Sequence, residues 1–509
     1  MEFLFDGFAA AFAFDNIVAL VIGTVVGLVV GVLPGLGPMV GMVVLLPFTF
    51  SLEASVALSL LLGVFCGGYF GGAVPAILLR TPGVPSSIVT SFDGFPLTER
   101  GEAQTALSAA LVGSLGGGLI SIVILVLLAP LLSGIAASFG PPEYLAAAVL
   151  GALLVVVAFR NQLGRGLLLL GIGLWLSTVG IDGPTLSPRY TFGFWDMQNG
   201  LDLVALVLGL FGIGQSLLLL EQGILKTDRL KLSRNSLDFS KIAGTLRYWK
   251  TLLRSGVIGT FIGLLPGPGS VLASFVAYDV AKRRSRKPEL FGTGTPEGCV
   301  AAEAANNAVP AGALIPLLTL GIPGEALSAV LLGVFTLNGI YPGPLLLVKE
   351  PALISTLYWS MLLINLVAFA VLAVWLRPFA MIVKVPPVVL AVCVIAVSLI
   401  GIYAVNTRLF DCGVALAAGL FGYLLLRLNW PVVSLVMGIV MGPIIEDRLR
   451  QTLSLGEGSL WILFERPLTL AIMAVALLIA TTPWLRARLA GSRRADRQPG
   501  DGSGTPPVR

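Results

Sequence analysis

The 509-residue sequence contains no histidine. This absence excludes histidine-based catalytic triads, HExxH zinc sites and proton relays built on histidine. A GxxxxGK[ST] phosphate-binding loop is also missing, so we do not expect the chain to hydrolyse ATP. If the protein transports a solute actively, it must use an ion gradient or a partner protein.

Charged residues are also scarce. They make up 12% of the chain, against 56% hydrophobic residues, whereas about a quarter of the residues in a soluble domain are charged. Several apolar runs approach the roughly 20 residues that span a bilayer core. These runs are Leu119 to Leu132, Tyr144 to Phe159, Leu201 to Leu220, Leu353 to Leu376, Val385 to Ala404 and Leu468 to Thr481. The composition predicts an all-α polytopic membrane protein in a lipid bilayer, with no nucleic acid as partner, rather than a large soluble protein.

The four cysteines, Cys66, Cys299, Cys393 and Cys412, show no CxxC spacing. We therefore expect neither a disulfide framework nor a metal cluster, and no organic cofactor. The first residues lack the Lys/Arg-rich start and the cleavage site of a signal peptide. The N-terminus is accordingly expected to remain on the mature protein.

The distribution of basic residues predicts which ends of the segments face the cytoplasm. No Lys or Arg occurs between Met1 and Leu79, so this end is predicted to be non-cytoplasmic. The segment from Lys226 to Arg254 is rich in Lys and Arg, and "KRRSRKPE" follows at 282–289. Both of these segments are predicted to be cytoplasmic. Asp182 and Asp196 suggest that the loop containing them is outside, although Arg189 departs from that pattern.

The apolar run from Ser255 to Ala281 is long enough to cross the membrane, yet both of its ends are predicted on the same side. The motif "GLLPGPGS" interrupts it at Pro266, Gly267 and Gly269. Proline cannot continue a helical ladder, and glycine adds no side chain. The run is therefore predicted to be a re-entrant hairpin, whose tip must be buried by protein or line a wet cavity.

A similar motif, "GVLPGLGP", occurs at 31–38 and contains Pro34, Gly35 and Gly37. Its flanks are acidic or neutral, so this hairpin is predicted to enter from the outside. Five spans are predicted between the two hairpins, at 54–79, 104–130, 142–159, 166–181 and 200–222. An odd number of spans inverts the second copy, and inverted repeats with broken helices are typical of secondary transporters.

The predicted organisation therefore has four parts. They are a first transmembrane repeat at 1–225, a basic cytoplasmic loop at 226–254, a second transmembrane repeat at 255–485, and a basic, disordered cytoplasmic tail at 486–509.

A second pair of breaks follows the hairpins, at Pro82-Gly83 and at Pro323-Gly324. Each precedes a short segment rich in small or hydroxylated residues, which suggests the start of a half-helix. The free amides and positive dipole end of such a start attract anions, most simply a carboxylate. Ser86 and Ser87 could add hydroxyl donors. The alternative is that these Pro-Gly pairs mark loops at the membrane surface.

Three polar residues, Glu303, Asn306 and Asn307, are spaced to share one helix face in an apolar segment. Polar groups at depth are costly and usually face a cavity or one another. The two asparagines could contact ion or substrate, and Glu303 could bind the coupling ion or accept a proton. The alternative is a structural network between helices. Asp279 and Glu325 are further candidates for ion coupling.

Long motifs in the chain resemble the large membrane subunit of the tripartite tricarboxylate transporters, the TctA family. They are "YFGGAVPAILLRTPGVPSSIVTSFDGFPL" in the first half, and "GLLPGPGSVLASFVAYDVAKR" and "GTGTPEGCVAAEAANNAVPAGALIPLLTLGIPGEALSAVLLG" in the second. By this resemblance, the glycine-rich motifs of the family fall on the substrate-binding candidates Pro34, Gly35, Gly37, Pro266, Gly267 and Gly269, with Pro82, Gly83, Pro323 and Gly324 at the second breaks.

The resemblance implies a multi-pass permease of the bacterial inner membrane. It would work with a small membrane subunit and a periplasmic solute-binding protein, and would import tricarboxylates or dicarboxylates with a sodium or proton gradient. In one respect the sequence departs from the family, because Ala73 follows Tyr69-Phe70-Gly71-Gly72 where a serine or threonine is common. This departure weighs against a tricarboxylate, and against a ligand role for that turn.

Two other classes of function compete with a coupled transporter. An anion channel or uniporter would share the polar groups but would need neither a binding protein nor a coupling gradient. An intramembrane enzyme is disfavoured, because the sequence shows no metal-ligand cluster and no evident nucleophile and base pair.

Overall fold

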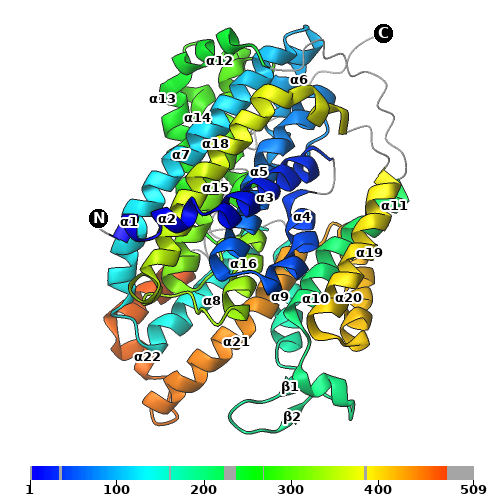
Figure 1. The fold of residues 1–509 in the computed structure, drawn as a ribbon. Helices are drawn as coiled ribbons and strands as arrows, with labels where there is room; N and C mark the ends of the chain where they lie inside the picture. The colour runs from blue at the N-terminus through cyan, green and yellow to red at the C-terminus, as the bar shows by residue number, and fades with distance from the viewer. Residues whose placement is uncertain are drawn as a thin grey trace, which may run out of the picture.

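The computed structural model describes residues 3–33, 37–159, 162–222, 237–267, 269–382 and 387–478. In this part of the chain helices dominate, and the only sheet is an antiparallel pair of two-residue strands, β1 (Gly180–Ile181) and β2 (Pro188–Arg189). Six of the described helices are long and apolar enough to cross a membrane. The predicted fold class, an all-α polytopic membrane protein, is confirmed (Figure 1).

The elements before residue 223 begin with two short helices and a helical hairpin. In order they are α1 (Phe3–Asp6), α2 (Phe8–Ala11), α3 (Phe14–Val32), α4 (Gly37–Leu45), η1 (Leu46–Ser51), α5 (Ala54–Leu79), η2 (Pro85–Ile88), α6 (Ser91–Glu99), α7 (Ala103–Ala136), α8 (Pro141–Ala158), α9 (Leu163–Leu176), β1, β2, η4 (Trp195–Asn199), α10 (Leu203–Val207), η5 (Leu208–Ile213) and α11 (Gly214–Gln222).

The elements after residue 236 also contain a hairpin, formed here by α13 and α14. In order they are α12 (Phe239–Thr245), η6 (Leu246–Tyr248), α13 (Trp249–Gly263), α14 (Gly269–Arg284), η7 (Pro288–Leu290), α15 (Pro296–Leu320), α16 (Ala326–Leu337), α17 (Leu346–Lys349), α18 (Pro351–Ile382), α19 (Pro387–Asn406), α20 (Leu409–Arg427), α21 (Val432–Leu455) and α22 (Ile462–Glu465), followed by a further apolar helix at Pro467–Leu478.

Two predicted segments lie partly or wholly outside the described residues. The described part of the basic stretch 226–254 contains α12 and the first residues of α13, which begins at Trp249. The ammonium group of Lys250 lies 5.6 Å from the centre of the Trp249 ring, within the range of a cation–π interaction. Residues 223–236 and the tail at 486–509 lie outside the described residues.

Long helices from the first half of the chain pack against long helices from the second half. Helix α5 packs along α18, and α15 packs along α7, so each helix lies against one from the other half of the chain. The hydroxyls of Ser59 on α5 and Ser360 on α18 are 2.9 Å apart. Two more sets of contacts join the halves in the same way. Helix α21 packs on α8 and α9, and α11 packs on α19 and α20. The two halves therefore share one interwoven core (Figure 1).

Each hairpin is held against its neighbouring long helix by glycines. A Cβ added at Gly23 on α3 would lie 2.0 Å from the carbonyl oxygen of Leu60, and one at Gly31 would lie 2.2 Å from that of Gly68. Helix α3 therefore runs parallel to α5 at close range. Small residues at such interfaces let the backbones approach and gain packing contacts. Glycines on α13 pack in the same way against α15.

The two hairpin units run in opposite directions. Asp93 follows the end of α5, and its carboxylate accepts hydrogen bonds from the backbone of Gly294 and Thr295, just before α15 begins. The Thr98 hydroxyl on α6 donates to the carbonyl of Ile77, so the end of α5 lies beside the start of α15. Glu325, just after the end of α15, bonds instead to Tyr69 in the middle of α5, so the two helices are antiparallel. This is the geometry expected of an inverted repeat. The division of the chain at 225 and 255 stays a prediction.

Candidate functional site

In the first half, the break after α5 packs into the hairpin. A Cβ added at Gly83 would lie 1.9 Å from the carbonyl oxygen of Gly31 on α3 and 2.9 Å from the Cα of Gly72 on α5. The amide of Gly83 donates a hydrogen bond to the carbonyl of Gly72 at 3.3 Å. No side chain fits at this position, so the break and the hairpin arm are in direct backbone contact.

The second half repeats this arrangement. A Cβ added at Gly324 would lie 2.8 Å from the carbonyl oxygen of Gly263 on α13 and 2.8 Å from the Cα of Ala313 on α15. The amide of Gly267, at the hairpin tip, donates to the carbonyl of Gly324 at 3.0 Å. The structure thus brings the tip of the second hairpin together with the second break, as the parallel motifs suggest.

The breaks also meet the opposite hairpins. The short helix η2 contacts α14 and α15, and α16 contacts α4 and α5. The predicted tip residues Pro34 and Gly35 lie outside the described residues, whereas Gly37 begins α4 with a φ of 67°. Glycine adopts this left-handed conformation without steric cost. The site is therefore built from both halves of the chain.

The remaining residues at the two breaks and at the second tip differ slightly in burial. Pro82 is partly exposed, and Ser86, Ser87, Pro266, Gly269 and Pro323 are buried. The Ser86 hydroxyl has no hydrogen-bond partner among the described residues. A buried hydroxyl without a partner is costly, which makes Ser86 a donor available to a ligand.

Glu303 lies at the centre of a buried polar network. Its carboxylate accepts hydrogen bonds from the hydroxyls of Thr90 and Ser114. The side-chain amides of Asn306 and Asn307 donate to the same group at 3.1 and 3.3 Å. Asn307 also donates to the Ser114 hydroxyl at 2.8 Å. The predicted shared face exists, and it ties α15 to α7 and to the segment after the first break.

The other two carboxylate candidates lie in different surroundings. Glu325 is 7% exposed and precedes α16. It accepts a hydrogen bond from the hydroxyl of Tyr69 at 2.9 Å. Asp279 is instead exposed on α14 and forms an ion pair with Arg283 at 2.8 Å. The structure therefore does not bring Asp279 to the breaks or the hairpin tips.

Tyr69 is a site residue that sequence reasoning missed. The stretch Tyr69 to Pro75 lies inside the 26-residue helix α5, in agreement with the span predicted at 54–79. The turn expected after Tyr69-Phe70-Gly71-Gly72 is therefore absent. The stretch stays helical because the runs on both sides are apolar and packed. A signal for Tyr69 was available, since the hydroxyl of a tyrosine within an apolar helix needs a buried partner.

Asp93 is a second residue that sequence reasoning did not assign to a cluster. One carboxylate oxygen accepts backbone hydrogen bonds from Gly292, Gly294 and Thr295, at 2.9, 2.9 and 3.0 Å. The other oxygen accepts from the hydroxyl of Tyr278 at 2.8 Å. This fully bonded carboxylate fixes α6 to the start of α15, and we assign it a structural role.

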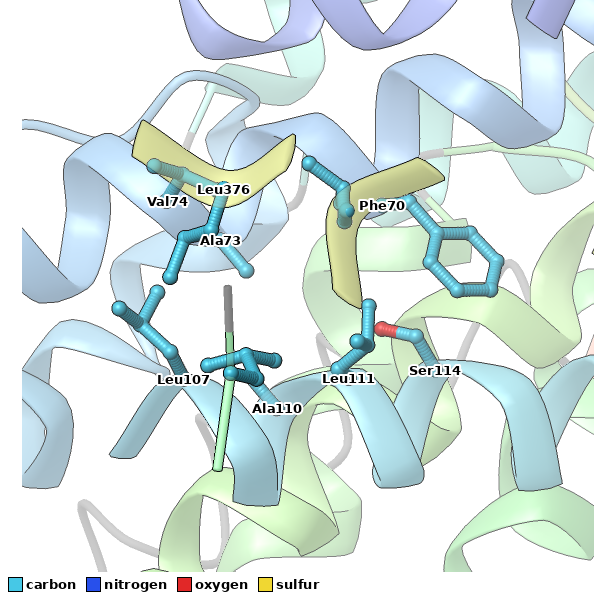
Figure 2. A pocket seen from close by; sticks show the side chains of 10 residues that line it. Phe70, Ala73, Val74, Leu107, Ala110, Leu111, Ser114 and Leu376 are labelled. Atoms are coloured by element: carbon cyan, nitrogen blue, oxygen red, sulfur yellow. The ribbon is translucent and has the colours of Figure 1, made fainter. Parts of the chain in front are cut away.

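An apolar pocket lies beside the Glu303 network (Figure 2). It is lined by α5, α7, α18 and Leu237, with Ser114 as the one hydroxyl at its wall. Phe70 and Leu111 flank that hydroxyl. Because the rest of the lining is aliphatic or aromatic, this pocket cannot supply the donors that a carboxylate needs. This pocket is therefore not a candidate anion site.

Comparison with known proteins gives a family match over most of the chain. The family model described as "Tripartite tricarboxylate transporter TctA family" matches residues 17–437. An uncharacterized 52.8 kDa protein from the 3′ region of ttuC′ in TAR-I of Agrobacterium vitis is 35% identical over 430 residues, which cover 82% of this chain and 83% of the relative.

A second uncharacterized protein, from the corresponding TAR-II region of Agrobacterium vitis, is 33% identical over 237 residues. These cover 45% of this chain and 96% of that relative. No solved structure matches the chain significantly.

Proposed function

The chain belongs to the tripartite tricarboxylate transporter TctA family, and from this premise we propose that it is the permease subunit of a secondary transporter. The permease imports carboxylate anions, either tricarboxylates or dicarboxylates, with a cation gradient. It works in the bacterial inner membrane with a small membrane subunit and a periplasmic solute-binding protein. Membership of a family of tripartite transporters supports the need for partner subunits.

The observation that carries this proposal is the meeting of both breaks with the hairpins at buried positions. Gly83 lies against Gly31, and Gly324 lies against Gly263 and bonds to Gly267. Irregular backbone at membrane depth is tolerated only where protein buries it or where it lines a water-filled cavity. Secondary transporters bind their substrate between two inverted repeats whose broken helices meet in this way.

A carboxylate would be held chiefly by backbone and hydroxyl donors. Helix α16 points its N-terminal amides toward the second break, and the Ser86 hydroxyl is buried at the first break without a partner. Amides at a helix start favour an anion through their partial positive charge. No basic side chain is required for such a site.

The test is uptake into liposomes that contain this chain and its small partner. Labelled citrate and a panel of dicarboxylates are supplied outside, with and without the matching binding protein, and initial rates are measured over a range of concentrations. We expect saturable uptake that requires the binding protein. Rates that never saturate and do not depend on the binding protein would instead identify an anion channel.

A further inference from the structure

The carboxylate of Glu325 accepts fewer hydrogen bonds than the two other buried carboxylates near the breaks, Glu303 and Asp93. One of its oxygens accepts from the Tyr69 hydroxyl at 2.9 Å, and the other, Oε1, has no hydrogen-bond partner among the described residues. Glu303 accepts from four neutral side chains, and Asp93 accepts from three backbone amides and one hydroxyl. Those four donors stabilise the negative charge of each group, whereas the Glu325 carboxylate accepts from a single side-chain donor, the Tyr69 hydroxyl.

Glu325 lies near the middle of the molecule. Its partner Tyr69 is about 22 Å along α5 from the start of that helix, at 1.5 Å per residue. The bond joins α5 of the first half to the start of α16 in the second half. The preceding residue, Gly324, accepts a hydrogen bond from the hairpin tip at Gly267. A change of charge at Glu325 would therefore act where both halves and a hairpin tip meet.

Little charge surrounds this carboxylate. The titratable side chains that interact with it are Tyr69 and Cys66, both on α5. Within the described residues no Lys or Arg forms an ion pair with Glu325. Helices α4, α10 and α15 also pack near α16, and the acidic groups of α15, Glu297 and Glu303, are bound to other side chains.

Helix α21 also contacts α16, and its charged residues form a separate network. There Glu446 binds Arg189 and Arg450. Asp447 and Arg448 are the other charged groups of that stretch, and Arg448 lies over the Tyr144 ring. An ionised Glu325 would accordingly be a buried charge without a cation beside it, offset only by the partial positive charge at the start of α16, where it is the N-cap residue. A buried charge without a cation is costly.

We propose that Glu325 is the binding site of the coupling ion and that this ion is a proton, held on Oε1. A proton needs one free acceptor, which Oε1 provides. A hard metal cation takes several oxygen ligands, and the Tyr69 hydroxyl already donates to the other oxygen. The uptake of one proton makes the carboxyl group neutral, so the break and the hairpin tip can move through a low-dielectric interior without an unpaired charge.

This inference rests on the proposed function only for its use in transport, and the site itself is tested without a substrate. Infrared spectra of the purified full-length chain are recorded across a pH series, and the C=O stretch of protonated carboxyl groups is followed. We expect a titrating band that is absent in Glu325→Gln and present in the control Glu303→Gln. In Tyr69→Phe the band should remain but shift in frequency, because a hydrogen bond is lost.

Three results would overturn the proposal. They are a titrating band that persists in Glu325→Gln, no such band in the wild type, or removal of the band by sodium at constant pH. In liposomes, Glu325→Gln should lose at least tenfold in proton-driven citrate accumulation. A band without any carboxylate transport would refute the proposed function but not the proton site, and transport without the band would do the reverse.

Discussion

At the scale of single residues, the structure separates three carboxylates that look alike in the sequence. Asp279 is paired on the surface, Glu303 is enclosed by donors, and Glu325 has one donor and one free oxygen. The difference depends on which side chains surround each carboxyl group. Helical spacing predicted the contact of Glu303 with Asn306 and Asn307, because those residues are neighbours on one helix.

The contacts that decide between the candidates join distant parts of the chain. The bond between Tyr69 and Glu325 spans 256 positions, and that between Asp93 and Gly294 spans 201. No periodicity in a single sequence encodes such pairs, because they depend on how the two halves pack. The breaks themselves could be predicted, since Pro and Gly interrupt apolar runs through local backbone chemistry.

Removal of the Glu303 carboxylate should destabilise the protein. In Glu303→Ala the hydroxyls of Thr90 and Ser114 and two side-chain amide groups lose a buried acceptor, so we expect the free energy of unfolding to fall by about 1 to 3 kcal/mol. Glu303→Gln keeps one acceptor oxygen and should lose less. Thermal unfolding in detergent measures both variants. Equal melting temperatures for wild type and Glu303→Ala would show that the network contributes nothing.

The free hydroxyl of Ser86 should contribute to substrate affinity. A hydrogen bond to a charged group contributes about 1.5 to 3 kcal/mol, so Ser86→Ala should raise the apparent KM for the carboxylate at least tenfold. Ser121→Ala is the matched control, because the Ser121 hydroxyl is buried and bonds to the carbonyl of Gly118 in its own helix. Concentration-dependent uptake compares the two, and equal affinities would remove Ser86 from the site.

At the scale of elements, the close contact between breaks and hairpins requires glycine. Gly83→Ala and Gly324→Ala place a methyl group on backbone atoms at 1.9 and 2.8 Å. Such overpacking costs about 1 to 3 kcal/mol, so we expect lower melting temperatures and strongly reduced uptake. Gly134→Ala is the control, because nothing lies within 4 Å of a Cβ there. Break variants that melt and transport like Gly134→Ala would contradict this packing.

The loop between α9 and α10 is held by an ion-pair cluster. Asp182 pairs with Arg450 at 2.8 Å and with Arg189 at 3.5 Å. Hydrogen bonds from Thr185, with the nearby arginines, hold the pKa of Asp182 below its ordinary value of 3.8. Arg189, which departs from the predicted acidic character of this loop, also binds Glu446 at 2.6 Å. Its charge is therefore balanced within the cluster.

A lowered folded-state pKa gives the loop a defined pH dependence. The stabilisation by ionised Asp182 is complete above the ordinary value and is lost as the pH falls through the lower folded-state value. The hydrogen-exchange protection factors of residues 180–200, which are corrected for the intrinsic pH dependence of exchange, should therefore fall only below about pH 3.8. Asp182→Asn should exchange faster at neutral pH and lack this transition. An acid transition that persists in Asp182→Asn would assign the effect to another group.

At the scale of the whole molecule, α12 and α13 lie at one end and the β1–β2 loop at the opposite end (Figure 1). With the exposed native Cys393 replaced by serine, we introduce Arg283→Cys or Leu186→Cys, both at exposed positions. A membrane-impermeant thiol reagent should label Leu186→Cys from the periplasmic side and Arg283→Cys only from the cytoplasmic side. Labelling of both from one side would contradict the predicted inverted topology.

The central claim, that this permease couples carboxylate entry to a cation gradient, is tested most directly by the steady-state ratio of internal to external citrate. It is measured in liposomes with the small partner inserted and the binding protein outside, under proton and sodium gradients imposed one at a time. We predict a ratio above the value set by membrane potential alone, and its collapse when the proton gradient is removed. A ratio that follows the membrane potential and ignores both gradients would contradict the account.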